Sequence, residues 1–211
     1  MKPIAILGSV VVALSLALPL ALLEARGLAA PAPAAQPSPA SNPAARAWEI
    51  DAVHSSVVFK VRHMGVAPFY GSFKQISGSV TLNADKPAES KVEITLPLSG
   101  IDTNNPGRDD HLKSPDFFNA AEFPEVKFSS KTVQKTDKGY KVEGLLTMHG
   151  VTKPVTLEVL SGGTAKSPKG EVAGFEVSAS FKRSDFGMDY GLEGIGDEVT
   201  LMAGIECKPA K

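Results

Sequence analysis

The sequence predicts an all-β domain, an antiparallel eight-stranded barrel, and three observations lead to this prediction. Apolar residues recur at every second position in many short segments, as in strands with one buried face. Short turns rich in Gly, Asn, Asp and Pro separate these segments. No segment keeps the helical period long enough for a βαβ unit. About eight such strands either close into a barrel or form a sandwich, and we favour the barrel because closure alone removes exposed edges.

The folded domain is expected to begin near Trp48, and the strands follow from the alternation of apolar and polar residues. The predicted strands are 57–61, 69–82 with a bend at Gly78, 92–98, 126–129, 140–148, 155–159, 175–181 and 199–207. Asp137-Lys138-Gly139 and His149-Gly150 are expected to form tight turns between neighbouring strands. Cys207 shares the apolar face of the last strand, so we expect a buried small hydrophobe rather than a reactive thiol.

Residues 101–124 interrupt the strand pattern, and we expect them to cap one end of the barrel. Asn105-Pro106-Gly107 predicts a turn, followed by a short helix over 108–113. Ser114 is expected to be the N-cap of a second short helix, with Pro115 at its first position. This second helix would carry Phe117 and Phe118 beside a dense cluster of charge.

The N-terminal residues predict export. Lys2 precedes a nearly unbroken apolar run over 4–23 and then small residues, so residues 1–29 are interpreted as a signal peptide. An uncleaved inner-membrane anchor is the alternative, since the run is long enough to span a bilayer. Residues 30–46 are a linker rich in Ala and Pro, and residues 47–209 are the barrel. The only cysteine is Cys207, which excludes an internal disulfide and a lipoprotein anchor after the signal.

The net charge of −1 and the pI of about 6.4 give no basic footprint, so no nucleic-acid partner is expected. After signal cleavage we expect no stable membrane insertion. The sequence is compatible with a homodimer and does not decide the oligomeric state.

Several long motifs, in order, resemble the YceI family across nearly the whole predicted domain. They are His54-Ser55-Ser56-Val57, Val61-Arg62-His63-Met64-Gly65, Gly71-Ser72-Phe73, Ile101-Asp102-Thr103, the run 108–118, Phe123-Pro124, the run 144–155 and Arg183-Ser184-Asp185-Phe186-Gly187. The resemblance implies a lipocalin-like barrel with a long apolar tunnel, exported to the bacterial periplasm. It also implies binding of an isoprenoid or a similar long-chain fatty amphiphile. Our own expectation is a carrier with no enzymatic activity.

The candidate ligand-binding residues are aromatic side chains for the tunnel and polar groups for a head group. The tunnel candidates are Phe59, Phe73, Phe117, Phe118, Phe128, Phe175 and Phe181, although aromatic residues in these positions could equally fill a packed core. Arg108, His111 and Asp102 could bind a polar or phosphorylated head group, or instead hold the capping segment in place.

We expect no metal site, cofactor or catalytic residue. The four histidines form no close sequence pair, no cysteine cluster is present, and there is no Gly-x-Ser-x-Gly motif. The glycine-rich run 187–196 opens no helix, so we interpret it as a loop at the barrel mouth rather than a phosphate loop. The alternative function is an enzyme acting on such a lipid, with His111, Asp102 and Arg108 as acid, base and electrophile.

Overall fold

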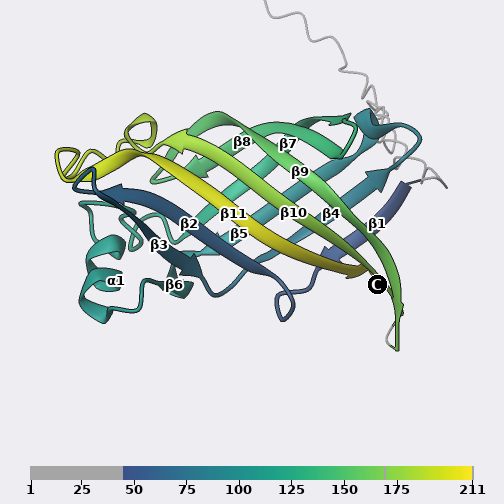
Figure 1. Cartoon of the computed structure of the whole chain (residues 1–211), viewed down its shortest axis with the longest axis horizontal. Helices are drawn as coiled ribbons and strands as arrows, with labels where there is room; N and C mark the ends of the chain where they lie inside the picture. The colour runs from purple at the N-terminus through teal and green to yellow at the C-terminus, as the bar shows by residue number, and fades with distance from the viewer. Residues whose placement is uncertain (1–44, 169, 211) are drawn as a thin grey trace, which may run out of the picture. The chain divides into compact units, whose positions relative to one another are not determined.

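Strands make up most of the residues that the computed structural model describes, which are 45–168 and 170–210. In chain order they are β1 (Ala45–Ile50), β2 (Ser56–His63), β3 (Ala67–Phe73), β4 (Ser77–Asn83), β5 (Lys91–Pro97), β6 (Ile101–Asp102), β7 (Glu125–Lys135), β8 (Gly139–Met148), β9 (Val151–Ser167), β10 (Gly170–Lys182) and β11 (Ile195–Pro209). One α-helix within the described residues, α1 (Pro106–Lys113), lies between β6 and β7 (Figure 1). The 3-10 turns are η1 (Pro87–Glu89), η2 (Leu98–Gly100) and η3 (Ser184–Phe186).

The predicted signal peptide and nearly all of the predicted linker lie outside the described residues. No helix in the described part of the chain is long and apolar enough to cross a membrane.

The sheet closes on itself because its first strand pairs with its last. The order is β1-β4-β5-β7-β8-β9-β10-β11, every neighbouring pair is antiparallel, and β1 also pairs with β11, with Trp48 opposite Pro209. The predicted closed eight-stranded antiparallel barrel is therefore confirmed.

Three positions in the barrel are each shared by two consecutive strands. Along β11, β2 pairs with the first part of the strand and β1 with its end. At the next position, β3 pairs with β2 and β4 pairs with β1. At the third position, β6 pairs with β3 and β5 pairs with β4. The predicted single strand over 69–82 is therefore wrong, because residues 74–76 break it before Gly78. The strand β1 was not predicted, since only Trp48 and Ile50 in it alternate as buried residues.

The capping segment contains one helix rather than two. Asn105 caps α1 by accepting a hydrogen bond from the Arg108 N–H, and Pro106 occupies its first turn. Ser114 ends α1 and does not begin a second helix, so that prediction is wrong. The backbone turns back here because the Phe118 N–H donates to the Leu112 carbonyl at 3.0 Å.

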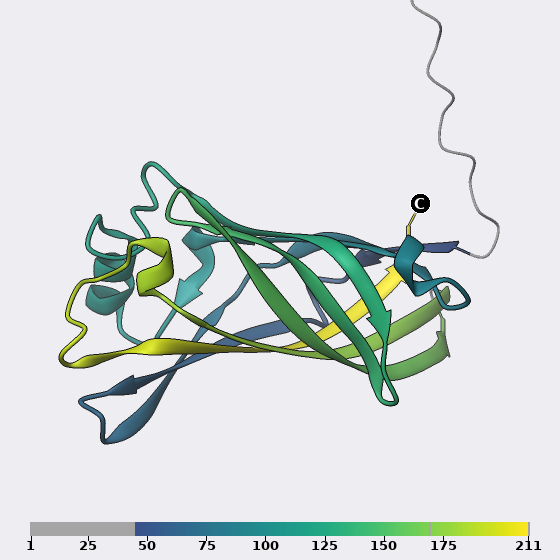
Figure 2. The same ribbon diagram turned by 90° about the horizontal axis from the view of Figure 1, so that it is seen from above.

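The segment between β6 and β7 lies at one end of the barrel, as predicted, and the described C-terminal end lies at the other (Figures 1 and 2). The Leu98 N–H, in η2 just before β6, donates to the Pro124 carbonyl at 2.9 Å and so ties the end of this segment to the chain that precedes β6.

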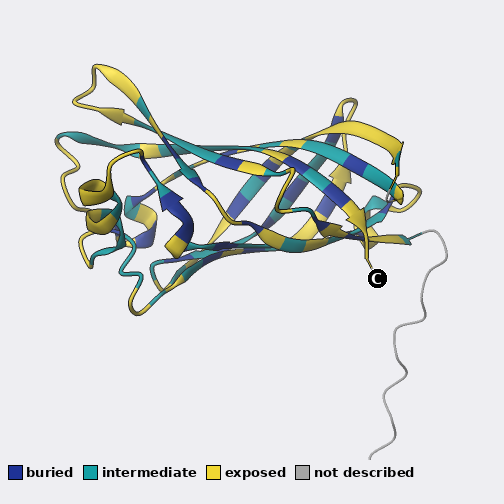
Figure 3. Ribbon diagram, turned by 90° about the horizontal axis from the view of Figure 1, so that it is seen from below, coloured by how far each residue is buried: buried dark blue, intermediate teal, exposed yellow. Residues whose placement is uncertain are grey.

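Buried apolar side chains from all around the barrel form its core, and burial alternates along the strands (Figure 3). Cys207 is 0% exposed, which confirms its expected burial. Across the β2–β3 pair, the ring of Phe59 lies over Gly71, where an added Cβ would come within 2.2 Å of the ring. Glycine is therefore required opposite this aromatic residue, because any side chain would displace the ring.

Candidate ligand-binding site

Three apolar cavities follow one another inside the barrel, with volumes of about 80, 60 and 50 Å³. The first and second cavities share Leu96, Val126 and Leu201 as lining residues. The second and third share Ile94, Leu157, Val177 and Ile205. Because neighbouring cavities have walls in common, only side chains separate them, and together they mark a path along the interior.

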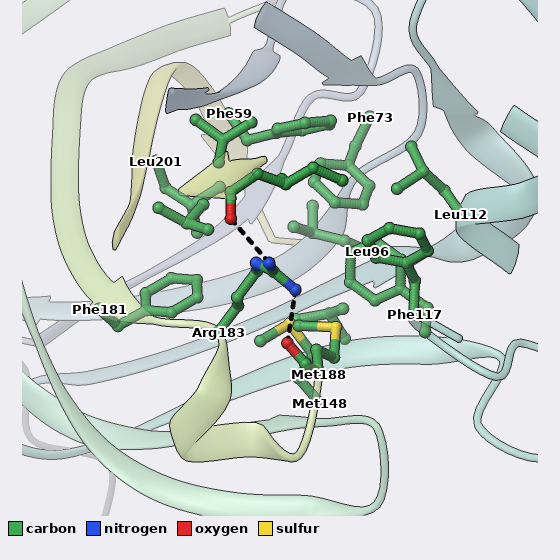
Figure 4. Close-up of a pocket in the computed structure, with 15 residues that line it drawn as sticks. Phe59, Phe73, Leu96, Leu112, Phe117, Met148, Phe181, Arg183, Met188 and Leu201 are labelled. Carbon is green, nitrogen blue, oxygen red and sulfur yellow. Dashed lines mark hydrogen bonds between the residues drawn. The ribbon is translucent and has the colours of Figure 1, made fainter. Parts of the chain in front are cut away.

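The aromatic residues predicted from the sequence line this path. Phe128 lies at the second cavity and Phe175 at the third. The first cavity is lined by the remaining five, which are Phe59, Phe73, Phe117, Phe118 and Phe181. All of these except Phe118 are labelled in Figure 4. The path is narrow, so these rings pack against core residues as well as lining free space.

A wider groove of about 360 Å³ lies between the β2–β3 hairpin and α1. We call it the mouth groove. Its lining includes His63 and Phe69 from the hairpin and Arg108 and His111 from α1. It shares with the first cavity the residues Phe59, Val61, Leu112, Phe117 and Ile195. The mouth groove therefore adjoins the interior path at the capped end of the barrel.

Arg108 both lines the mouth groove and fastens the capping segment. Its Nε donates to Thr103 Oγ1 at 2.9 Å and its Nη2 to the Thr103 carbonyl at 2.7 Å. The guanidinium carbon lies 4.4 Å from the centre of the Phe69 ring, so the cation stacks on the opposite wall of the groove. Both sequence interpretations of Arg108 are compatible with this arrangement.

His111 belongs to an aromatic cluster at the boundary between groove and interior. Its Nε2 lies 2.9 Å from Asp116 Oδ2, and its ring centre is 5.1 Å from those of Phe117 and Tyr190. Phe117 and Tyr190 also pack edge to face, at 5.3 Å. Tyr190 comes from the glycine-rich loop after η3, which therefore borders the mouth as predicted. Sequence reasoning did not select Tyr190, because nothing in the spacing places this loop against α1.

Asp102, the third polar candidate, is not among the residues that line the groove. Its carboxylate lies 2.8 Å from Lys74 Nζ and accepts from the Asn104 N–H at 2.9 Å. The hydrogen bond from Lys74, with that from Asn104, lowers the pKa of Asp102 from its ordinary value. Asp102, Arg108 and His111 thus each have a different hydrogen-bonding partner among the described residues.

Arg183 is a buried cation in the wall of the first cavity, and sequence reasoning missed it (Figure 4). The residue is 3% exposed, and it donates to the carbonyls of Gly196, Met188 and Ile195 at 3.0, 2.6 and 2.8 Å. Burial lowers the pKa of its guanidinium, and Asp197 and Asp189 act in the opposite direction. Its position in the cavity wall could have been predicted from the sequence, because Arg183 lies two residues after Phe181 and so continues the inward-facing positions of β10.

Two of the other histidines, His54 and His149, lie in turns. His149 Nδ1 lies 3.0 Å from the Phe186 carbonyl, in the predicted turn. His54 lies beside Asp51 and Glu206, with Nδ1 at 3.1 and 3.6 Å from their carboxylate oxygens. Although these three groups lie close enough for a metal ion, Asp51 also accepts from the Val53 N–H, and His54 is mostly exposed. The geometry fits a hydrogen-bonded turn between β1 and β2.

The fold and the cavities define a class: a closed antiparallel barrel with an apolar interior that meets, at one end, a mostly apolar groove bearing one arginine and two histidines. The chain belongs to the YceI-like domain family, whose match covers residues 48–207. It is 41% identical over 170 residues to the UPF0312 protein plu2095 of Photorhabdus laumondii, covering 79% of this chain and 88% of that protein.

Solved structures share the fold. The Campylobacter jejuni YceI protein is 32% identical, with a TM-score of 0.63 over 71% of this chain and 90% of that one. A polyisoprenoid-binding domain from Saccharophagus degradans, implicated in plant cell wall breakdown, is 14% identical, with a TM-score of 0.54 over 78% of this chain and 99% of that one. Since the matching barrel makes up most of the Campylobacter chain, we treat it as an independently folding unit.

Proposed function

We propose that this protein binds a long-chain isoprenoid or a similar amphiphile inside the barrel and carries it in the periplasm without transforming it. The observation that carries the proposal is the run of apolar cavities that adjoins a groove bearing Arg108 and His111. The periplasmic location rests on the signal peptide expected in residues 1–29.

Apolar burial can supply the affinity for such a ligand. Each buried methylene contributes about 0.8 kcal/mol, so a dozen contribute about 10 kcal/mol before ordering costs. Micromolar binding requires about 8 kcal/mol. No catalytic group is therefore needed for a tail to be held.

The narrow cavities require the interior to widen around a tail. Met148 and Met188 line the first cavity, and methionine adapts readily because its chain is unbranched and has several rotatable bonds. We propose that these side chains move aside when a tail occupies the path.

The head group would remain in the mouth groove. Arg108 uses two of its five N–H donors on Thr103, which leaves donors for an acceptor such as a phosphate or hydroxyl. The separate partners of Asp102, Arg108 and His111 favour binding over a catalytic triad. The polyisoprenoid-binding Saccharophagus domain shares the fold, which makes an isoprenoid a reasonable first ligand to test.

The test is native mass spectrometry of the protein purified from a bacterial periplasm without detergent, followed by lipid extraction and identification. We expect a long-chain adduct at one per barrel. Leu201→Trp should remove it by filling the junction of the first two cavities, whereas Met202→Trp, at the next position and outside these cavities, should keep it. Both variants must keep the melting transition of the wild type. A clean ligand-free mass that persists after incubation with isoprenoid alcohols and phosphates would overturn the proposal.

A further inference from the structure

Large apolar side chains are exposed at the end of the barrel that bears the mouth groove. Met64 and Val66, at the tip of the β2–β3 hairpin, are 62% and 79% exposed. Leu192, in the loop between η3 and β11, is 41% exposed. We call these three residues the apolar tip.

The two loops of the apolar tip are joined. The Met64 N–H donates to the Gly194 carbonyl at 2.6 Å, and His63 pairs with Ile195. Figure 1 shows the hairpin and the yellow loop next to each other at the end that also carries α1. Figure 3 shows that the projecting hairpin is largely exposed there. A hairpin on its own would move freely, whereas the bond to Gly194 holds its apolar residues beside Leu192.

The apolar tip is continuous with the mouth groove. His63 and Ala67, which flank the turn that carries Met64 and Val66, line that groove. The groove also contains Arg108 and His111, and no carboxylate is among its lining residues. Arg108 lies where it can meet the phosphates of a lipid surface, while Glu193, the exposed neighbour of Leu192, adds a negative charge at the same end.

We propose that the apolar tip is a peripheral docking surface for a phospholipid bilayer. This inference rests on the proposed function, because a water-insoluble ligand must be collected from a membrane or released to one. Met64, Val66 and Leu192 enter the boundary between head groups and acyl chains, while Arg108 meets the lipid phosphates. The mouth groove then faces the bilayer, and the ligand passes between membrane and barrel without crossing water. Exposed apolar residues on loops beside a cavity mouth suit such transient contact, since three side chains are too few for permanent anchoring.

The experiment uses residues 30–211, so that the apolar N-terminal run cannot contribute, and vesicles of phosphatidylethanolamine with phosphatidylglycerol. The test variant combines Met64→Asn, Val66→Ser and Leu192→Ser. Asn suits position 64 because Met64 has a φ of 52°, which Asn tolerates well. The matched control combines Val53→Ser and Leu160→Ser, which are 83% and 43% exposed and lie in the β1–β2 turn and in β9, away from the tip.

Two quantities are measured: partitioning onto vesicles by co-sedimentation, and the rate at which a fluorescent long-chain isoprenoid moves between vesicles and protein. The test variant should partition about ten-fold more weakly than the wild type, while the control stays at the wild-type value. Transfer into the wild type should accelerate with vesicle concentration, as collision requires, and lose this dependence in the test variant. Binding of the isoprenoid delivered from ethanol without vesicles should be the same in all three proteins.

The outcomes separate this inference from the proposed function. If no protein binds the isoprenoid from ethanol but the wild type still partitions onto vesicles through the tip, the carrier function fails and the docking surface stands. If wild type and test variant partition equally, the docking surface is wrong. The same holds if the test variant changes only a dimer into a monomer in analytical ultracentrifugation, because the tip would then be a contact between two copies.

Discussion

The guanidinium of Arg183 lies 6.0 Å from the ring centre of Phe117, which joins the end of β10 to the segment that caps the barrel. Arg183 also holds the following loop through three carbonyls, and the same loop brings Tyr190 against Phe117. One buried cation thus organises two of the segments around the mouth, although from the sequence it was placed only in a family motif and not among the candidate ligand-binding residues.

Replacing Arg183 should be costly. Arg183→Leu leaves one buried and two partly buried carbonyls without this donor, and we expect it to lower the free energy of unfolding by about 3 kcal/mol. Arg183→Lys keeps the charge but cannot reach all three carbonyls, so its cost should be intermediate. Urea denaturation measures both, with Lys182→Leu on the exposed neighbouring residue as control. Equal stabilities of the wild type and Arg183→Leu would show that the loop does not depend on this residue.

The turn between β8 and β9 should tolerate only glycine at its second position. His149 and Gly150 have φ values of 52° and 73°, and an added Cβ at Gly150 would come within 2.6 Å of the Phe123 ring. Gly150→Ala should therefore lower the free energy of unfolding by about 2 kcal/mol, from backbone strain and the clash together. Gly163→Ala is the control, because Gly163 has a φ of 86° with nothing within 4 Å of the added Cβ. Thermal denaturation of the two variants separates clash from strain, and equal losses would contradict the clash.

Cys207 should be unreactive in the folded protein. Burial, with the nearby Glu206 carboxylate, raises the pKa of its thiol to about 11, so very little thiolate exists near neutral pH. We expect Ellman's reagent to label it at pH 8 only as the barrel opens, and at once in concentrated urea. Lys131→Cys, on the exposed part of β7, supplies a thiol that should react immediately. Rapid labelling of native Cys207 would mean that the seam between β1 and β11 opens often.

The Asp102–Lys74 pair should contribute to stability at neutral pH and not in acid. The hydrogen bond from Lys74 lowers the pKa of Asp102 in the folded state, so its stabilising effect is present above the ordinary value of about 4. It is lost as the pH falls through the folded value. The difference in urea midpoint between the wild type and Asp102→Asn should accordingly shrink below about pH 4. Asp137→Asn, in the exposed β7–β8 turn, should show a smaller difference at neutral pH; a pH-independent gap for Asp102→Asn would contradict the assignment.

The sequence predicted the barrel because alternation is a local property, as in Phe175 to Phe181, where every second residue faces inward. The same alternation predicted that the strand residues Phe175 and Phe181 line the interior cavities. The prediction of a second helix was wrong because Ser114 ends α1 where the Phe118 N–H donates to the Leu112 carbonyl. A helix-cap pattern in the sequence does not reveal this backbone hydrogen bond. Tyr190 and its contact with His111 arise from loops far apart in the chain, and alternation carries no information about them.

Closure through β1 and β11 also affects how the chain reaches its native state. Trp48 pairs with Pro209, so the pairing that closes the ring joins the first strand to the last. Such distant pairings form slowly, because a long loop must close before they contribute any stability. The β1–β11 seam cannot form until the final strand is available, so a chain still emerging from a ribosome cannot close its barrel until Pro209 has been made.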